Sequence, residues 1–180
     1  MTLTSTDRVP FAHAGLAALV VALVGAATLA GAWFFQYVLH LPPCPLCLEQ
    51  RIPYYVAVPL AILVAIAAMT HVARAPVVAG LVLIGAVMLV GAGLGLYHSG
   101  VEWHWWAGPL DCSGPLTNLG AAPDLAKQLQ NFQVVRCDEA AWRFLGVSLA
   151  GYNVLISAGL AAVVTWAIVA FVRRPPTADR

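Results

Sequence analysis

The sequence predicts an all-α membrane protein, a bundle of four transmembrane helices, and three observations support this. First, 61% of the 180 residues are hydrophobic and only 9% are charged, whereas a soluble domain carries roughly 25% charged residues. Second, four apolar runs are each long enough to cross a hydrocarbon layer about 30 Å thick, which takes about 20 helical residues. Third, all four cysteines lie between these runs. We therefore expect one integral-membrane domain over residues 1–180.

The four spans are expected at residues 11–35, 52–69, 77–97 and about 144–172. None of them contains Asp, Glu or Lys, and the first three contain no Arg. Because backbone polar groups in lipid must be paired within their own segment, these runs are expected to be helices. The first run could instead be a cleaved signal peptide, since Arg8 precedes it, but its apolar stretch of about 25 residues exceeds the usual 7 to 15 of a signal core.

The distribution of basic residues predicts which side of the membrane each connection faces. The two tails and the short turn at 70–76 hold five arginines in about 24 residues, and the loops at 36–51 and 98–143 hold four Lys or Arg in about 62 residues. The positive-inside bias therefore places both termini in the cytoplasm and both cysteine-bearing loops outside it. With a net charge of +1 and no basic tract, no nucleic-acid partner is expected.

The second outer loop is expected to carry a short amphipathic helix over residues 123–132. Pro123 suits the first helical position, Asp124 favours the positive end of the helix dipole, and Leu125, Leu129 and Phe132 fall on one face. Such a helix would lie along the outer membrane surface or pack on its own loop. Both arrangements fit the pattern.

Aromatic residues gather at the outer ends of the expected spans, as an interfacial belt would. The residues concerned are Trp33, Tyr37, Tyr54, Tyr55, Tyr97, Trp103, Trp105 and Trp106.

The four cysteines are the main candidates for chemistry. Cys44 and Cys47 form a Cys-x-x-Cys motif in the first outer loop, and Cys112 and Cys137 lie in the second. In an oxidising compartment the default expectation is two disulfides. A zinc site is disfavoured because the second pair lacks the close spacing of zinc ligands, so no metal is expected. The second pair could be structural or exchangeable.

A redox role is favoured for the Cys-x-x-Cys motif. A disulfide between its two cysteines would close a short ring, and a position near a helix can lower the pKa of a thiol. Arg51 also follows Cys47 by four residues, within about one helical turn. Arg51 could simply extend its charge into the lipid headgroups. At the mouth of the second span it could also stabilise negative charge on a sulfur or on a reduced quinone oxygen. His98, at the outer end of the third span, is a weaker candidate, because a lone histidine there is more often a hydrogen-bonding residue.

Taken together, these features resemble the disulfide bond formation protein B (DsbB) family of bacterial inner-membrane thiol oxidases. The resemblance covers nearly the whole chain, through four spans, a Cys-x-x-Cys motif followed by arginine, and two further cysteines in the second outer loop. Its specific parts are Pro43-Cys44-Pro45-Leu46-Cys47 with Gln50-Arg51, Tyr97-His98, and Glu102 with Trp105, Pro109 and Cys112.

The resemblance implies that the protein reoxidises a periplasmic DsbA-like thioredoxin-fold oxidase and passes the electrons to membrane quinone, either ubiquinone or menaquinone. It further implies that Cys112 forms the mixed disulfide with the partner and that Cys137 exchanges with Cys44. Cys47 would then be the thiolate that faces the quinone. Arg51 would bind the quinone, with His98 nearby.

Two alternatives are kept. A vitamin K epoxide reductase-like enzyme also couples Cys-x-x-Cys chemistry to a quinone, but in that family the loop cysteines precede the Cys-x-x-Cys motif, the reverse of the order here. The chain could also be a non-catalytic membrane module stapled by two inert disulfides.

Overall fold

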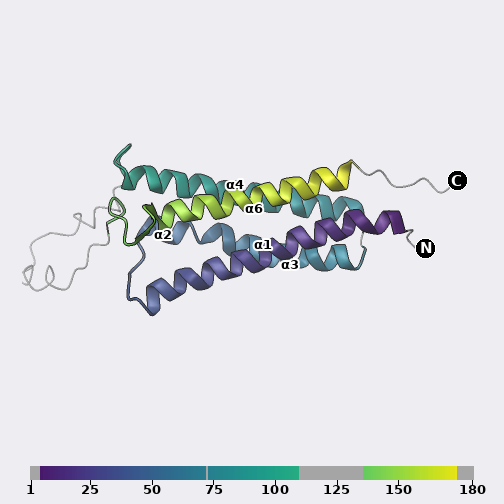
Figure 1. Cartoon of the computed structure of the whole chain (residues 1–180), viewed down its shortest axis with the longest axis horizontal. Helices are drawn as coiled ribbons and strands as arrows, with labels where there is room; N and C mark the ends of the chain where they lie inside the picture. The colour runs from purple at the N-terminus through teal and green to yellow at the C-terminus, as the bar shows by residue number, and fades with distance from the viewer. Residues whose placement is uncertain (1–4, 72, 110–135, 174–180) are drawn as a thin grey trace, which may run out of the picture.

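The computed structural model describes residues 5–71, 73–109 and 136–173, and it is built mainly of helices. Four long helices lie side by side (Figure 1), namely α1 (Ser5–Tyr37), α3 (Ile52–Met69), α4 (Arg74–Glu102) and α6 (Leu149–Val172). The smaller elements are α2 (Pro45–Glu49) and an antiparallel hairpin of β1 (Arg143–Phe144) and β2 (Val147–Ser148).

The long helices alternate in direction, so the two ends of the bundle differ. The start of α1, the α3–α4 turn and the end of α6 lie at one end, and α2 and the hairpin lie at the other (Figure 1). Each of the four is long and apolar enough to cross a membrane. Both described cysteine-bearing segments therefore lie at the end opposite the start of α1.

Several helix boundaries differ from the expectation by a few residues, and two of these differences matter for the site. α4 continues to Glu102 rather than ending near residue 97, which places His98 and Glu102 four residues apart on one face of a helix. α6 begins at Leu149 rather than near residue 144. Leu145 and Gly146 both have positive φ, so they form the tight turn of a hairpin.

Small residues allow the helices to approach one another. Ala14 and Ala18 of α1 and Ala57 and Ala61 of α3 are buried in one core cluster. A Cβ added at Gly80 of α4 would overlap Cγ2 of Val64 on α3. Many large aliphatic side chains are instead exposed on the outside of the bundle, the arrangement that helices packed in lipid adopt.

Tyr54 does not belong to the expected aromatic belt. Its side chain is only 2% exposed and lies in the core, whereas Tyr55 beside it is 45% exposed. The reason is hydrogen bonding: the Tyr54 hydroxyl lies 2.7 Å from Asn153 Oδ1 and 2.8 Å from Ser157 Oγ, both on α6. The amphipathic helix expected at residues 123–132 lies outside the described residues.

Candidate functional site

The Cys-x-x-Cys motif forms the start of α2. Cys44 is the residue that caps this helix, and its sulfur accepts a hydrogen bond from the backbone N–H of Cys47 at 3.3 Å. Pro45 occupies the first turn, where a missing N–H costs nothing. The two sulfur atoms are 2.9 Å apart, well beyond a disulfide bond of about 2.05 Å. This pair is therefore a dithiol here, and the default expectation of a disulfide is not met.

The second outer loop returns to the same place. Cys137, which is disulfide-bonded, is fully buried in a cluster with Cys44, Leu46 and Val101. Cys112 lies outside the described residues. The structure thus packs a disulfide-bonded cysteine of the second loop into one apolar cluster with a free thiol of the first.

His98 lies beside the dithiol. Its Nε2 is 3.7 Å from Cys44 Sγ and 3.9 Å from Glu102 Oε1, and its ring also interacts with the backbone of Cys137. Both His98 and Glu102 are buried. Within the described part of the chain, Glu102 Oε2 has no hydrogen-bond partner. The site therefore contains a buried acidic side chain, Glu102, which the sequence analysis named only as part of the family resemblance.

The hydrogen bond between the two sulfurs, together with the ring of His98, outweighs burial and lowers the pKa of the Cys44 thiol to about 5. A thiol with this pKa is a thiolate at neutral pH. The resemblance places the quinone-facing thiolate on Cys47. In the dithiol state, however, the hydrogen-bond donors gather around Cys44, and His98 rather than Arg51 is the neighbouring basic group.

Arg51 turns away from the sulfur atoms toward α1. Its Nη1 donates to Gln36 Oε1 at 2.7 Å and its Nη2 to the backbone oxygen of Ala32 at 3.5 Å. The expected stabilisation of a thiolate by Arg51 is therefore not seen in these contacts. Arg51 and Cys47 nevertheless face the same space.

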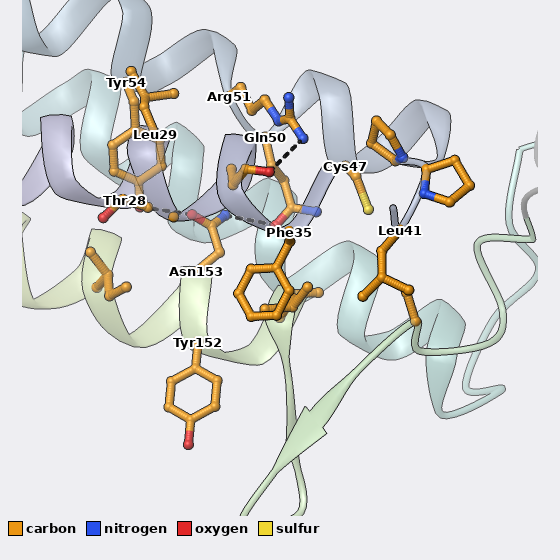
Figure 2. Close-up of a pocket in the computed structure, with 18 residues that line it drawn as sticks. Thr28, Leu29, Phe35, Leu41, Cys47, Gln50, Arg51, Tyr54, Tyr152 and Asn153 are labelled. Carbon is orange, nitrogen blue, oxygen red and sulfur yellow. Dashed lines mark hydrogen bonds between the residues drawn. The ribbon is translucent and has the colours of Figure 1, made fainter. Parts of the chain in front are cut away.

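That space is a cavity of about 280 Å³ between α1, the 41–43 segment, α3 and α6. Figure 2 shows Cys47, Gln50, Arg51 and Asn153 around it. Apolar side chains form much of the remaining wall, among them Leu29, Phe35, Leu41 and Ile156. Of the two residues expected to bind a quinone, Arg51 lines the cavity, whereas His98, which contacts Cys44, does not.

A buried chain of polar side chains joins the site to the core, and sequence reasoning missed it. Gln50 Nε2 is 2.6 Å from His98 Nδ1, and Gln50 Oε1 accepts from Asn153 Nδ2 at 2.7 Å. Asn153 in turn accepts from Tyr54. Gln50 was visible only as part of the family motif. An asparagine inside an apolar run was the available signal for Asn153, because a buried amide needs partners.

The ligand atoms of Cys44, Cys47 and His98 lie within 4.8 Å of one another, and thiolate and imidazole are zinc ligands. The ring nitrogen that faces the sulfurs is Nε2. Gln50 Nε2 lies 2.6 Å from the other ring nitrogen, Nδ1.

A membrane-spanning helical bundle that holds a dithiol beside a cavity, with a disulfide-bonded cysteine packed against Cys44, has the elements of a membrane thiol oxidoreductase. The chain belongs to the DsbB family: the family model described as disulfide bond formation protein DsbB matches residues 14–167. No curated protein and no solved structure matched the chain. The family and the structure together confirm the expected four-helix membrane fold and make the protein an oxidoreductase of disulfide bond formation.

Proposed function

We propose that this protein is a quinone-linked oxidase that refills a periplasmic DsbA-like dithiol oxidase with disulfides. The observation that carries the proposal is that Cys47, the half-buried member of the dithiol, lines the same cavity as Arg51. A lipid-soluble electron acceptor bound in this cavity would lie beside Cys47.

The lining of the cavity fits a quinone. A quinone ring is flat and largely apolar and carries two carbonyl acceptors, so it needs apolar walls with a few donors. Leu29, Phe35 and Ile156 supply the walls, and the Arg51 guanidinium supplies a donor with a fixed positive charge. When bound, a quinone would accept the two electrons and two protons released as Cys44 and Cys47 form a disulfide.

The rest of the cycle is thiol–disulfide exchange, which conserves electrons. The new Cys44–Cys47 disulfide would be attacked by the reduced loop pair, which would leave Cys112 and Cys137 bonded and the inner pair as the dithiol. The loop disulfide would then oxidise the partner. A DsbA-like dithiol has a potential of about −120 mV, so thiols alone would run uphill and a stronger acceptor must supply the drive.

The same proposal fixes the orientation of the chain. We place the protein in the bacterial inner membrane with both termini in the cytoplasm and the cysteine loops in the periplasm. Arg74 and Arg173 lie at the ends of α4 and α6 remote from the dithiol, which agrees with the positive-inside bias. A DsbA-like partner would meet the protein at the dithiol end.

Quinone kinetics test the role of Arg51. In Arg51→Met we expect the KM for a soluble quinone analogue to rise about tenfold, because a charged hydrogen bond is worth roughly 1.5 kcal/mol or more. The KM for the reduced partner should stay unchanged. Arg143→Met is the matched control, since Arg143 is exposed on β1 and does not line the cavity. An unchanged quinone KM in Arg51→Met would remove Arg51 from the site.

A trapping experiment tests the partner. In Cys137→Ser we expect a mixed disulfide between Cys112 and a periplasmic thioredoxin-fold protein on a non-reducing gel, and its disappearance when Cys112→Ser is added. If no adduct forms in membranes that contain quinone and the partner, the loop cysteines are structural and the inert-module alternative stands.

A further inference from the structure

Five buried side chains form one continuous chain from the dithiol into the bundle. It runs from Cys44 through His98, Gln50 and Asn153 to Tyr54, with donor–acceptor distances of 3.7, 2.6, 2.7 and 2.7 Å. All five are less than 10% exposed. The links connect α2, α3, α4 and α6, so the setting of His98 is determined by residues on several helices.

Two backbone carbonyl groups fix the orientation of the amides in this chain. Gln50 Nε2 donates to the backbone oxygen of Leu46 at 3.3 Å, and Asn153 Nδ2 donates to that of Gly91 at 3.3 Å. A carbonyl oxygen can only accept, so each amide must turn its NH₂ group toward it. The reversed amide of Gln50 would set oxygen against the Leu46 oxygen and NH₂ against the NH₂ of Asn153.

The orientation of Gln50 decides which nitrogen of His98 carries the proton. Gln50 presents an N–H group to Nδ1 at 2.6 Å, so Nδ1 must be an unprotonated acceptor. A neutral imidazole has one N–H group, which must then be on Nε2. This nitrogen faces Cys44 Sγ at 3.7 Å and Glu102 Oε1 at 3.9 Å. His98 therefore turns a donor, and not a lone pair, toward the sulfur.

We propose that Gln50, held by Asn153, is a positioning residue that keeps the proton of His98 on Nε2 and so directs a hydrogen-bond donor at the Cys44 thiolate. The inference rests on the proposed redox role of Cys44 and deepens it. Gln50 has no hydrogen bond to either sulfur, so its effect passes through the imidazole ring. The opposite tautomer would aim a lone pair at the thiolate and repel it.

The groups that face the Cys44 sulfur are consistent with this role. Cys47 approaches it from α2 with both its backbone N–H and its thiol, and His98 approaches from α4. Glu102 does not bond the sulfur but approaches the same Nε2, with its Oε1 at 3.9 Å. Cys137 from the second loop packs against Cys44 but is disulfide-bonded and does not titrate. His98 is thus the titratable group whose tautomer can change the environment of this thiolate.

The tautomer can be measured directly by ¹⁵N NMR of ring-labelled histidine in the reduced full-length protein in lipid nanodiscs. To isolate one signal, the other histidines are replaced by glutamine, namely His13, His40, His71 and His104. We expect an unprotonated Nδ1 and a protonated Nε2 for His98. In Gln50→Glu, a carboxylate that only accepts replaces the donor, so Nδ1 should gain a proton. Gln36→Glu is the control, because Gln36 bonds Arg51 and not His98.

A protonated Nδ1 in the unmodified site would overturn the proposal, and this result needs no variant at position 50. An unchanged Nδ1 in Gln50→Glu, in protein that keeps its helical circular dichroism, would also overturn it. Asn153→Leu separates the two amides: if Asn153 holds Gln50 in place, the single tautomer should give way to a mixture.

The consequence for the sulfur is measured by the absorbance of the thiolate at 240 nm during a pH titration. The reduced protein carries Cys112→Ser and Cys137→Ser, so that Cys44 and Cys47 are the remaining thiols. We expect Gln50→Leu to raise the midpoint by about one pH unit, and thus to leave about tenfold less thiolate below both midpoints. An unchanged midpoint would show that the tautomer does not act on Cys44.

Neither measurement contains quinone or a partner protein, so their failure is distinct from that of the proposed function. A protein that reduces no quinone but shows the predicted tautomer and midpoint would refute the oxidase assignment alone.

Discussion

Replacing Tyr54 by phenylalanine should loosen the contact between α3 and α6. The Tyr54 hydroxyl makes two short contacts across these helices, to Asn153 Oδ1 at 2.7 Å and to Ser157 Oγ at 2.8 Å. Side-chain hydrogen bonds between membrane helices are worth about 0.6 kcal/mol on average and about 1.7 at most. Two of them lost together should cost about 1 to 2 kcal/mol. The phenylalanine ring would keep the packing of the buried tyrosine ring.

The assay is unfolding of the purified protein by SDS in mixed micelles, followed by circular dichroism with the cysteines held in one redox state. Tyr55→Phe is the matched control, since Tyr55 is the next residue on the same helix and is largely exposed. Tyr54→Phe should unfold at a lower SDS fraction than both the wild type and Tyr55→Phe. If Tyr54→Phe and Tyr55→Phe unfold at the same SDS fraction, the Tyr54 hydroxyl does not connect α3 to α6 in the way described.

Three further predictions concern packing, pH and orientation. Gly80→Ala should cost about 1 to 3 kcal/mol, because its Cβ would meet Val64, whereas Gly93→Ala, with nothing within 4 Å, should be neutral or stabilising; equal effects would contradict the packing. Because the pKa of Cys44 is lowered to about 5 in the folded protein, the unfolded chain binds more protons between about pH 5 and 9, and the reduced protein should gain stability as the pH rises through that range. The disulfide form, in which Cys44 does not titrate, should lack this gain. A membrane-impermeant thiol reagent should label reduced Cys112 in intact spheroplasts, and labelling after lysis alone would invert the topology.

The four helices could be predicted from the sequence because hydrophobic length is a local property. The place of each polar side chain around its helix could not. Tyr54 and Tyr55 are neighbours of the same type at the same depth, and only the position of α6 decides that Tyr54 is buried. The sequence also predicts the end of α4 too early, at residue 97 rather than at Glu102, because residues 98–102 are less apolar than the run before them. The candidate site depends both on where the helices lie and on which way their polar side chains point, so the sequence predicts only part of it.

Arg51 shows the same limit at the candidate site. Sequence spacing placed its charge within a helical turn of Cys47, but the direction of a long side chain depends on acceptors elsewhere in the fold. Gln36 and the backbone of Ala32 on α1 supply those acceptors. The Cys-x-x-Cys motif itself can be recognised in the sequence because its spacing is covalent and local. Its hydrogen-bonding partner, His98, is 54 residues away from Cys44.

Asn153 lies on α6, the last of the four spans along the chain. While the protein is being inserted, α1 to α4 can enter the membrane before this residue is available to hold Gln50. At that stage His98 would lack the amide that sets its tautomer, so the pKa of Cys44 would lie above its value of about 5 in the complete bundle. The part of the lowering that comes through His98 would therefore develop only after α6 has been inserted, so the Cys44 thiol would be less reactive in the nascent chain than in the complete bundle.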